Sequence, residues 1–200
     1  MFRIILLTSA LISLGGSAAL AEQADLPMRP SDTVRICEGC HGPGGDSTVS
    51  SVPRLNGQQA AYILARLQDF QNPAKEAPHA SHNMPQEVVN LPEVSRAAIS
   101  RYFSDQTPTP ANSSFVESAG QLLFETGYPS ADIPACRSCH GAHGEGAGSV
   151  PRLTGQHAEY LEDQLWVFKF GLRQHAVMRA NTNKMTSEQI HALVTYLANN

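Results

Sequence analysis

Two short motifs contain all four cysteines of this 200-residue chain. Residues 37–41 read C-E-G-C-H and residues 136–140 read C-R-S-C-H, so both follow the pattern C-x-x-C-H. Two thiols about one helical turn apart can add to the two vinyl groups of one porphyrin, and the histidine that follows can then bind the iron. This spacing is typical of the attachment of a c-type haem.

The motifs therefore predict two covalently bound haems, each held by two thioethers and one axial histidine. The attaching residues are Cys37, Cys40, Cys136 and Cys139, and the axial histidines are His41 and His140. A zinc site would need four ligands and would leave both histidines without a role. A thioredoxin-like site would need one C-x-x-C in a βαβ setting, and disulfides would give no reason for a histidine after each pair.

The first 21 residues have the composition of a secretory signal peptide. Arg3 supplies a positive charge, residues 4–14 form an apolar run too short to span a bilayer, and residues 19–21 read A-L-A, a small-x-small cleavage site. We expect cleavage before Glu22 and export to the periplasm, without membrane insertion afterwards. The alternative is a retained N-terminal anchor.

The charge of the chain limits its partners. It has 14 basic and 18 acidic residues, and neither half is basic. This balance argues against nucleic acid and against anionic lipid as partners.

The sequence is one unit written twice. Residues 52–58 read V-P-R-L-N-G-Q, and residues 150–156 read V-P-R-L-T-G-Q, 98 positions later. Two copies are too few for a solenoid, so the repeat predicts a tandem pair of small domains. We expect a first domain over 22–104, a linker over 105–113 with two prolines, and a second domain over 114–200.

The coarse pattern within each unit is helical, and no stretch alternates well enough to form a strand. Capping boxes begin two of the expected helices, at Ser114 and at Thr186. The fold class we expect is all-α, with each small helical domain wrapped around one haem. The expected helices cover residues 33–40, 58–71, 92–103, 114–124, 156–170 and 186–198. In the third of them we expect Val94, Ala98 and Phe103 to lie on similar faces.

The second axial ligand of each iron is predicted to be a methionine. Met84 and Met178 are 94 residues apart, and each lies in a loop before the last helix of its unit. Met185 aligns instead with Leu91 at the same offset and precedes the Thr186 cap, so we expect it in the core. Histidine plus methionine raises the haem potential, because thioether sulfur favours ferrous iron.

Other polar residues in these segments are weaker candidates. His79, His82 and His175 lie near the methionines, but none recurs at the repeat offset, so we expect them outside the iron coordination. Arg54 and Arg152 do recur. They could meet the haem propionates or could be ordinary exposed arginines, and the sequence leaves both possibilities open.

With these motifs the chain resembles the cytochrome c4 family of tandem class I cytochromes c, over residues 30–200. The resemblance implies two haem domains related by an approximate twofold axis, with a close haem–haem contact. It implies that the carbonyls of Pro53 and Pro151 accept the Nδ1 protons of the axial histidines. It also implies that Gly120 and Phe124 pack near Tyr196, whereas Asp32 stands where the first domain would carry the glycine.

The function that this resemblance implies is electron transfer in the periplasm. We expect a soluble carrier that passes single electrons from a respiratory donor to a terminal acceptor such as an oxidase, with redox proteins of a membrane oxidase or reductase complex as partners. The alternative is a dihaem subunit fixed to a dehydrogenase, for example a flavoprotein. A dihaem peroxidase would need one releasable ligand position, and a matched methionine in both units argues against such an enzyme.

Overall fold

The structure is a computed structural model that describes residues 30–72, 84, 90–110 and 118–200. Within these ranges the chain forms helices and loops, and the only β-type pairings are two isolated bridges. The all-α prediction is confirmed for this part of the chain. The predicted signal peptide, His79 and His82 lie outside the described residues.

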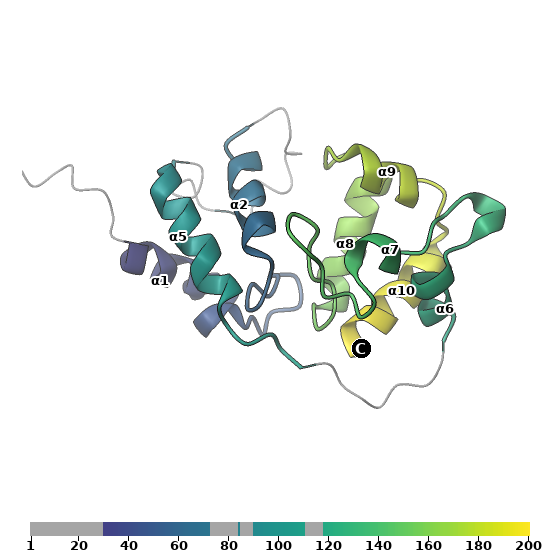
Figure 1. Cartoon of the computed structure of the whole chain (residues 1–200), viewed down its shortest axis with the longest axis horizontal. Helices are drawn as coiled ribbons and strands as arrows, with labels where there is room; N and C mark the ends of the chain where they lie inside the picture. The colour runs from purple at the N-terminus through teal and green to yellow at the C-terminus, as the bar shows by residue number, and fades with distance from the viewer. Residues whose placement is uncertain (1–29, 73–83, 85–89, 111–117) are drawn as a thin grey trace, which may run out of the picture.

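The described residues of the first domain form three helices (Figure 1), which pack around a small core. They are α1 (Pro30–His41), α2 (Ala60–Asp69) and α5 (Glu93–Ser104), with a short 3₁₀ turn η1 (Pro43–Gly45) after α1. Helix α2 buries Ile63 and Leu67, four residues apart on one face, and α5 buries Ile99 and Phe103 in the same way. These four side chains form the centre of the first core cluster.

One expectation for α5 is wrong. We expected Val94 to lie on the same face as Phe103, but Val94 is 71% exposed. The buried face of the helix runs through Ser95, Ile99 and Phe103, which are spaced by four residues. Val94 lies one position from that row, about 100° around the helix, and therefore faces outward.

The second domain has the same plan with additional short elements. Its elements are α6 (Ala119–Thr126), η2 (Pro129–Ala131), α7 (Arg137–His140), α8 (Ala158–Lys169), α9 (Ala176–Thr182) and α10 (Ser187–Asn199). The expected start of a helix at Ser114 lies outside the described residues. Helix α6 itself begins at Ala119, because the hydroxyl of Ser118 accepts a hydrogen bond from the Gln121 N–H and caps it.

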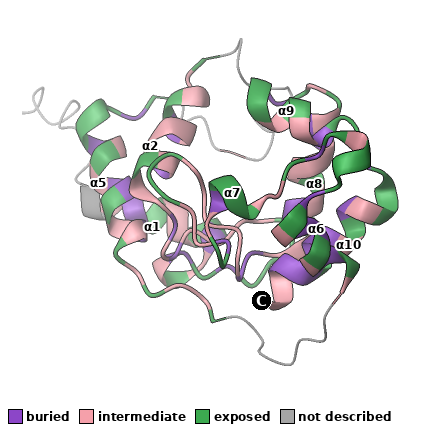
Figure 2. Ribbon diagram, turned by 45° about the vertical axis from the view of Figure 1, so that its right-hand side comes forward, coloured by how far each residue is buried: buried purple, intermediate pink, exposed green. Residues whose placement is uncertain are grey.

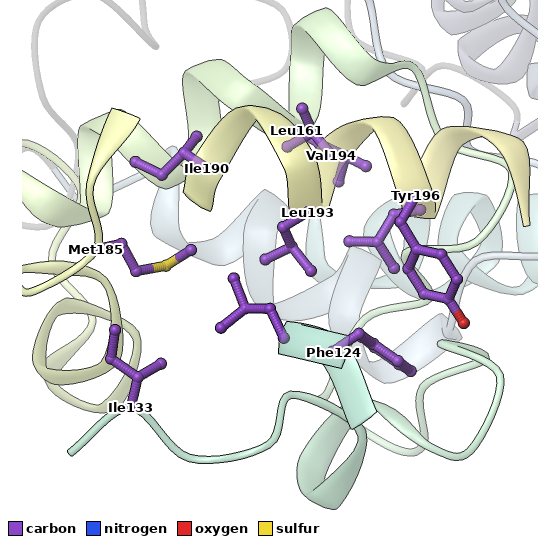
Figure 3. Close-up of a cluster of buried hydrophobic side chains, with 10 residues drawn as sticks. Phe124, Ile133, Leu161, Met185, Ile190, Leu193, Val194 and Tyr196 are labelled. Atoms are coloured by element: carbon purple, nitrogen blue, oxygen red, sulfur yellow. The ribbon is translucent and has the colours of Figure 1, made fainter. Parts of the chain in front are cut away.

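The core of the second domain is built on α10. The predicted capping box is present: the Thr186 hydroxyl accepts from the Gln189 N–H, and the Gln189 side chain accepts from the Thr186 N–H. Helix α10 then buries a row of apolar side chains against α6 and α8 (Figure 3). Phe124 lies beside Tyr196, with ring centroids 5.6 Å apart.

The two domains reach their haem motifs by different routes. In the first, α1 continues without a break through Cys37 and Cys40 to His41. In the second, α6 ends at a glycine, Gly127, with φ 73°, and the chain makes the η2 turn before α7 carries the second motif. The first helix of domain one therefore carries both the inter-helix packing and the haem motif.

The segment that connects the domains packs against Gly57 and Gly155, the glycines of the two V-P-R-L-x-G-Q repeats. A Cβ at Gly57 would lie 2.3 Å from Pro108 Cγ, and one at Gly155 would lie 2.6 Å from the Thr109 carbonyl oxygen. Both glycines also have positive φ, 65° and 75°. Asn56 adds a hydrogen bond from its amide to the Thr107 carbonyl, 2.9 Å long. Glycine at these two positions therefore lets the connecting segment lie directly on both repeats.

Exposure differs strongly between the elements (Figure 2). Residues of α10 alternate between buried and exposed as in an amphipathic helix, whereas most of α9 is exposed. In the part of the chain that the structure describes, no helix has the length and apolar character needed to cross a bilayer.

Candidate haem sites

His41 is the last residue of α1, and its ring is held by a single directional bond. Its Nδ1 lies 2.8 Å from the carbonyl oxygen of Pro53, and since a carbonyl only accepts, Nδ1 carries the proton. The residue is 7% exposed. Burial lowers the pKa of His41, and the bond to Pro53 only partly opposes this. The imidazole is therefore neutral with a lone pair on Nε2, which is the form that binds a metal.

His140 repeats this arrangement at the end of α7. Its Nδ1 lies 3.0 Å from the carbonyl oxygen of Pro151, and it is also 7% exposed. The pKa of His140 is lowered chiefly by burial, and nearby His175 lowers it further. The tautomer is the same in both domains, because the V-P-R-L repeat presents its proline carbonyl at the same place.

The cysteines of each motif are divided between inside and outside. Cys37 packs against the first core cluster and Cys136 against the second, whereas Cys40 and Cys139 are exposed. Burial raises the pKa of the Cys37 thiol to about 11 and that of Cys136 likewise to about 11. The two C-x-x-C pairs belong to separate cores, so they do not form one four-cysteine zinc site.

The structure distinguishes the three methionines of these segments. Met84 is partly buried and packs against the first core cluster, the cluster that Cys37 also contacts. Met185 is 4% exposed within the core of the second domain (Figure 3), as the repeat predicted. Met178 is partly buried, but the expectation that it lies in a loop is wrong: it belongs to the first turn of α9.

His175 has a local role beside Met178. It is the N-cap of α9, and its Nδ1 accepts a hydrogen bond from the Met178 N–H at 3.2 Å. Its ring also meets Phe168 edge to face, with centroids 6.0 Å apart. The sequence contained no signal for this short helix, because residues 171–182 show neither a clear apolar period nor a usual capping residue.

Two buried glutamines join the domains, and sequence reasoning used them only as markers of the repeat. The Gln156 side chain accepts from the Arg54 N–H and donates to the Arg54 carbonyl, both at 2.9 Å. The Gln58 side chain makes the same two bonds to Arg152, at 2.7 and 2.9 Å. Their recurrence at an offset of 98 was the available signal, since a twofold interface repeats its contacts.

The two recurring arginines differ in their side-chain contacts. Arg54 donates from a guanidinium nitrogen to the Gly155 carbonyl at 2.6 Å, and its Nε lies 3.2 Å from the Asp46 carboxylate. Neither buried arginine Nε makes a hydrogen bond within the described residues, although that of Arg54 lies close to the Asp46 carboxylate. A buried donor of this kind fits an anionic group such as a haem propionate. With the neutral histidines, it makes the residues present compatible with bound haem.

Arg173 makes another contact between the domains, one that no sequence pattern indicates. Arg173 is buried before α9, and its guanidinium lies 3.2 Å from the Tyr62 hydroxyl on α2 of the other domain. It also donates to Gln164 at 2.6 Å and stacks over the Phe168 ring, 4.6 Å from its centroid. The segment that leads to Met178 is thus attached to the first domain.

Comparison with known proteins agrees with this arrangement. A family model described as Cytochrome c matches residues 118–200. The cytochrome c4 of Azotobacter vinelandii is 33% identical over 204 residues, covering 96% of this chain and 96% of that protein. The thiosulfate dehydrogenase electron acceptor of Stutzerimonas stutzeri is 28% identical, covering 94% of this chain and 90% of that protein. A solved cytochrome c4 from Acidithiobacillus ferrooxidans superimposes with a TM-score of 0.74 at 33% identity, covering 82% of this chain and 98% of that one.

Proposed function

The chain belongs to the cytochrome c4 family of dihaem electron-transfer cytochromes, and we propose that it carries single electrons in the periplasm between a respiratory donor and a terminal acceptor such as an oxidase. It is an electron-transfer protein with two covalently bound c-type haems, not an enzyme. When bound, the haems supply reversible one-electron exchange at iron. The observation that carries the proposal is the matched pair of neutral histidines, each fixed by a proline carbonyl.

We assign the residues of each site from the motifs and the repeat. Thioethers form at Cys37 and Cys40 in one domain and at Cys136 and Cys139 in the other. His41 and Met84 are the axial ligands of the first iron, and His140 and Met178 those of the second. The burial of Met185 within the core supports this choice, since its thioether packs among apolar side chains.

The proposed organisation is a signal peptide over 1–21, haem domains over 22–104 and 114–200, and a linker over 105–113. Intact mass spectrometry of the protein secreted by a bacterial host tests the cofactor and the export together. The expected mass is that of the chain from Glu22 plus two haems. A mass with one haem or none contradicts the two-haem proposal. A mass that includes residues 1–21 contradicts cleavage and indicates a retained N-terminal anchor.

Carbon monoxide tests whether both irons have six protein ligands. The ferrous protein should bind carbon monoxide poorly at neutral pH, because histidine and methionine fill both axial positions. Turnover of hydrogen peroxide should be negligible for the same reason. Stoichiometric, high-affinity binding of carbon monoxide to one haem would show that this iron lacks a firmly bound methionine.

The second candidate function is a subunit fixed to a dehydrogenase. The similarity to a protein named as the electron acceptor of thiosulfate dehydrogenase favours it. Native purification without detergent distinguishes the two functions. A free carrier elutes as a single chain, whereas a fixed subunit co-elutes in constant ratio with a second redox protein.

A further inference from the structure

One peptide unit in each domain makes hydrogen bonds on both of its sides. The oxygen of the Pro53–Arg54 peptide accepts the Nδ1 proton of His41 at 2.8 Å, and its N–H donates to Gln156 of the other domain at 2.9 Å. The Pro151–Arg152 peptide does the same between His140, at 3.0 Å, and Gln58, at 2.7 Å. Each axial histidine is thus two hydrogen bonds from a glutamine of the opposite domain.

The orientation of each glutamine amide is set by three hydrogen bonds. The Oε1 of Gln156 also accepts from the N–H of His157 at 3.0 Å, and the Oε1 of Gln58 accepts from the N–H of Gln59 at 2.9 Å. Each Nε2 donates to an arginine carbonyl of the opposite domain. An amide rotated by 180° would place NH₂ against two N–H groups, so only one orientation satisfies the site.

The two sides of a peptide unit are electronically coupled. Because the peptide bond is delocalised, an acceptor on its N–H increases the negative charge on its oxygen. Hydrogen bonds in such a chain strengthen one another, by about 10–30% per bond. A stronger acceptor at Nδ1–H makes the imidazole a more basic ligand, as outer-shell partners of metal-bound histidines do. A more basic axial ligand stabilises ferric over ferrous iron and lowers the potential.

We propose that each buried glutamine tunes the haem of the opposite domain through this peptide: Gln156 lowers the potential of the haem bound by His41, and Gln58 that of the haem bound by His140. This inference rests on the proposed histidine ligation. The two glutamines act as positioning residues, since neither contacts a haem ligand itself. The domain interface therefore contributes to both potentials, in addition to holding the domains together.

The test is a set of glutamine substitutions with domain-resolved potentials. Gln156→Leu should increase the ferrous-to-ferric ratio of the first haem about twofold at a fixed applied potential. This corresponds to a rise of about 18 mV in the reduction potential of that haem, at 59 mV per tenfold change. Gln58→Leu should have the same effect on the second haem alone. Each potential is followed by the NMR signals of its own haem methyl groups during a redox titration. Gln156→Met, which keeps the length of the side chain, should reproduce the effect without loosening the packing.

Gln59→Leu is the matched control. Gln59 also bonds across the interface, from its amide to the Glu145 carbonyl at 3.0 Å, but that carbonyl accepts from no axial histidine. Its loss should leave both potentials unchanged. If Gln156→Leu shifts the potentials of both haems together, or if the control shifts them equally, general loosening of the interface sets the potentials. The proposed tuning through the peptide unit would then be rejected.

A second measurement separates this inference from the ligand assignment. In the ferrous protein, the Nδ1–H signals of His41 and His140 should be shifted by the haem ring current. If those ring-current shifts are absent from the unaltered protein, the proposed ligation fails. If they are present but Gln156→Leu does not move the His41 signal, the ligation stands and the proposed tuning through the peptide unit is overturned.

Discussion

Gly120 lies where α6 packs tightly against α10, and a methyl group there should separate the two helices. An added Cβ would lie 2.0 Å from the Ala192 carbonyl oxygen and 2.9 Å from the Cβ of Tyr196. Since atoms in ordinary contact lie about 3.5 Å apart, the helices must move apart by more than about 1 Å. That movement also loosens Phe124, which is fully buried against Tyr196.

The magnitude follows from two opposing effects of Gly120→Ala. Overpacking costs about 1–3 kcal/mol, and contact with rigid backbone on the other helix places this site near the upper end. Alanine in place of glycine within a helix recovers about 1 kcal/mol. The net loss should be about 2 kcal/mol, which lowers the Tm of a domain of this size by roughly 10 °C.

Thermal unfolding followed by NMR signals of each domain measures this loss separately for the two halves. Gly39→Ala is the matched control, because Gly39 also lies in a helix but has no atom within 4 Å of its added Cβ. It should stabilise the first domain by up to about 1 kcal/mol. If Gly120→Ala is as stable as the unaltered protein, or more stable, the close contact of α6 with α10 is not as the structure has it.

Three further changes have defined outcomes. Met178→Ala should remove one of two weak sulfur-to-iron bands in the far red and lower one potential, whereas Met185→Leu should keep both bands; the reverse result would make Met185 the ligand. Thr186→Ala removes the cap of α10 and should cost about 1 kcal/mol in urea unfolding of the second domain; an unchanged midpoint would show that the cap contributes nothing. Arg173→Leu leaves the Tyr62 hydroxyl without its guanidinium partner and should weaken the contact between the domains by about 1.5–3 kcal/mol, so that the contact is lost at a lower temperature on heating. A contact that survives to the same temperature contradicts this role.

Much of the chemistry could be predicted from residue types and spacing. The C-x-x-C-H motifs require no knowledge of the fold, because all their atoms belong to five consecutive residues. The repeat predicts Met178 rather than Met185 as the ligand, since the register from Met84 carries over at a constant offset. The capping box at Thr186 was predictable because its donors and acceptors lie within one helical turn.

Local pattern was a poorer guide where the tertiary environment decides. Helix α9 could not be predicted because His175, an unusual cap, begins it and most of its side chains are exposed. The exposure of Val94 likewise depends on which side of α5 meets α2, and the apolar sequence of that helix is compatible with more than one face.

The domain interface shows most clearly what only the tertiary structure decides. The sequence determined that Gln58 and Gln156 recur, but a recurring polar residue can equally be exposed. Their role depends on backbone groups of Arg54 and Arg152, which lie about a hundred residues away and carry no side-chain signature. Covalent attachment is specified by neighbours along the chain, whereas pairing between domains is specified by backbone geometry that appears only when both domains have folded and met.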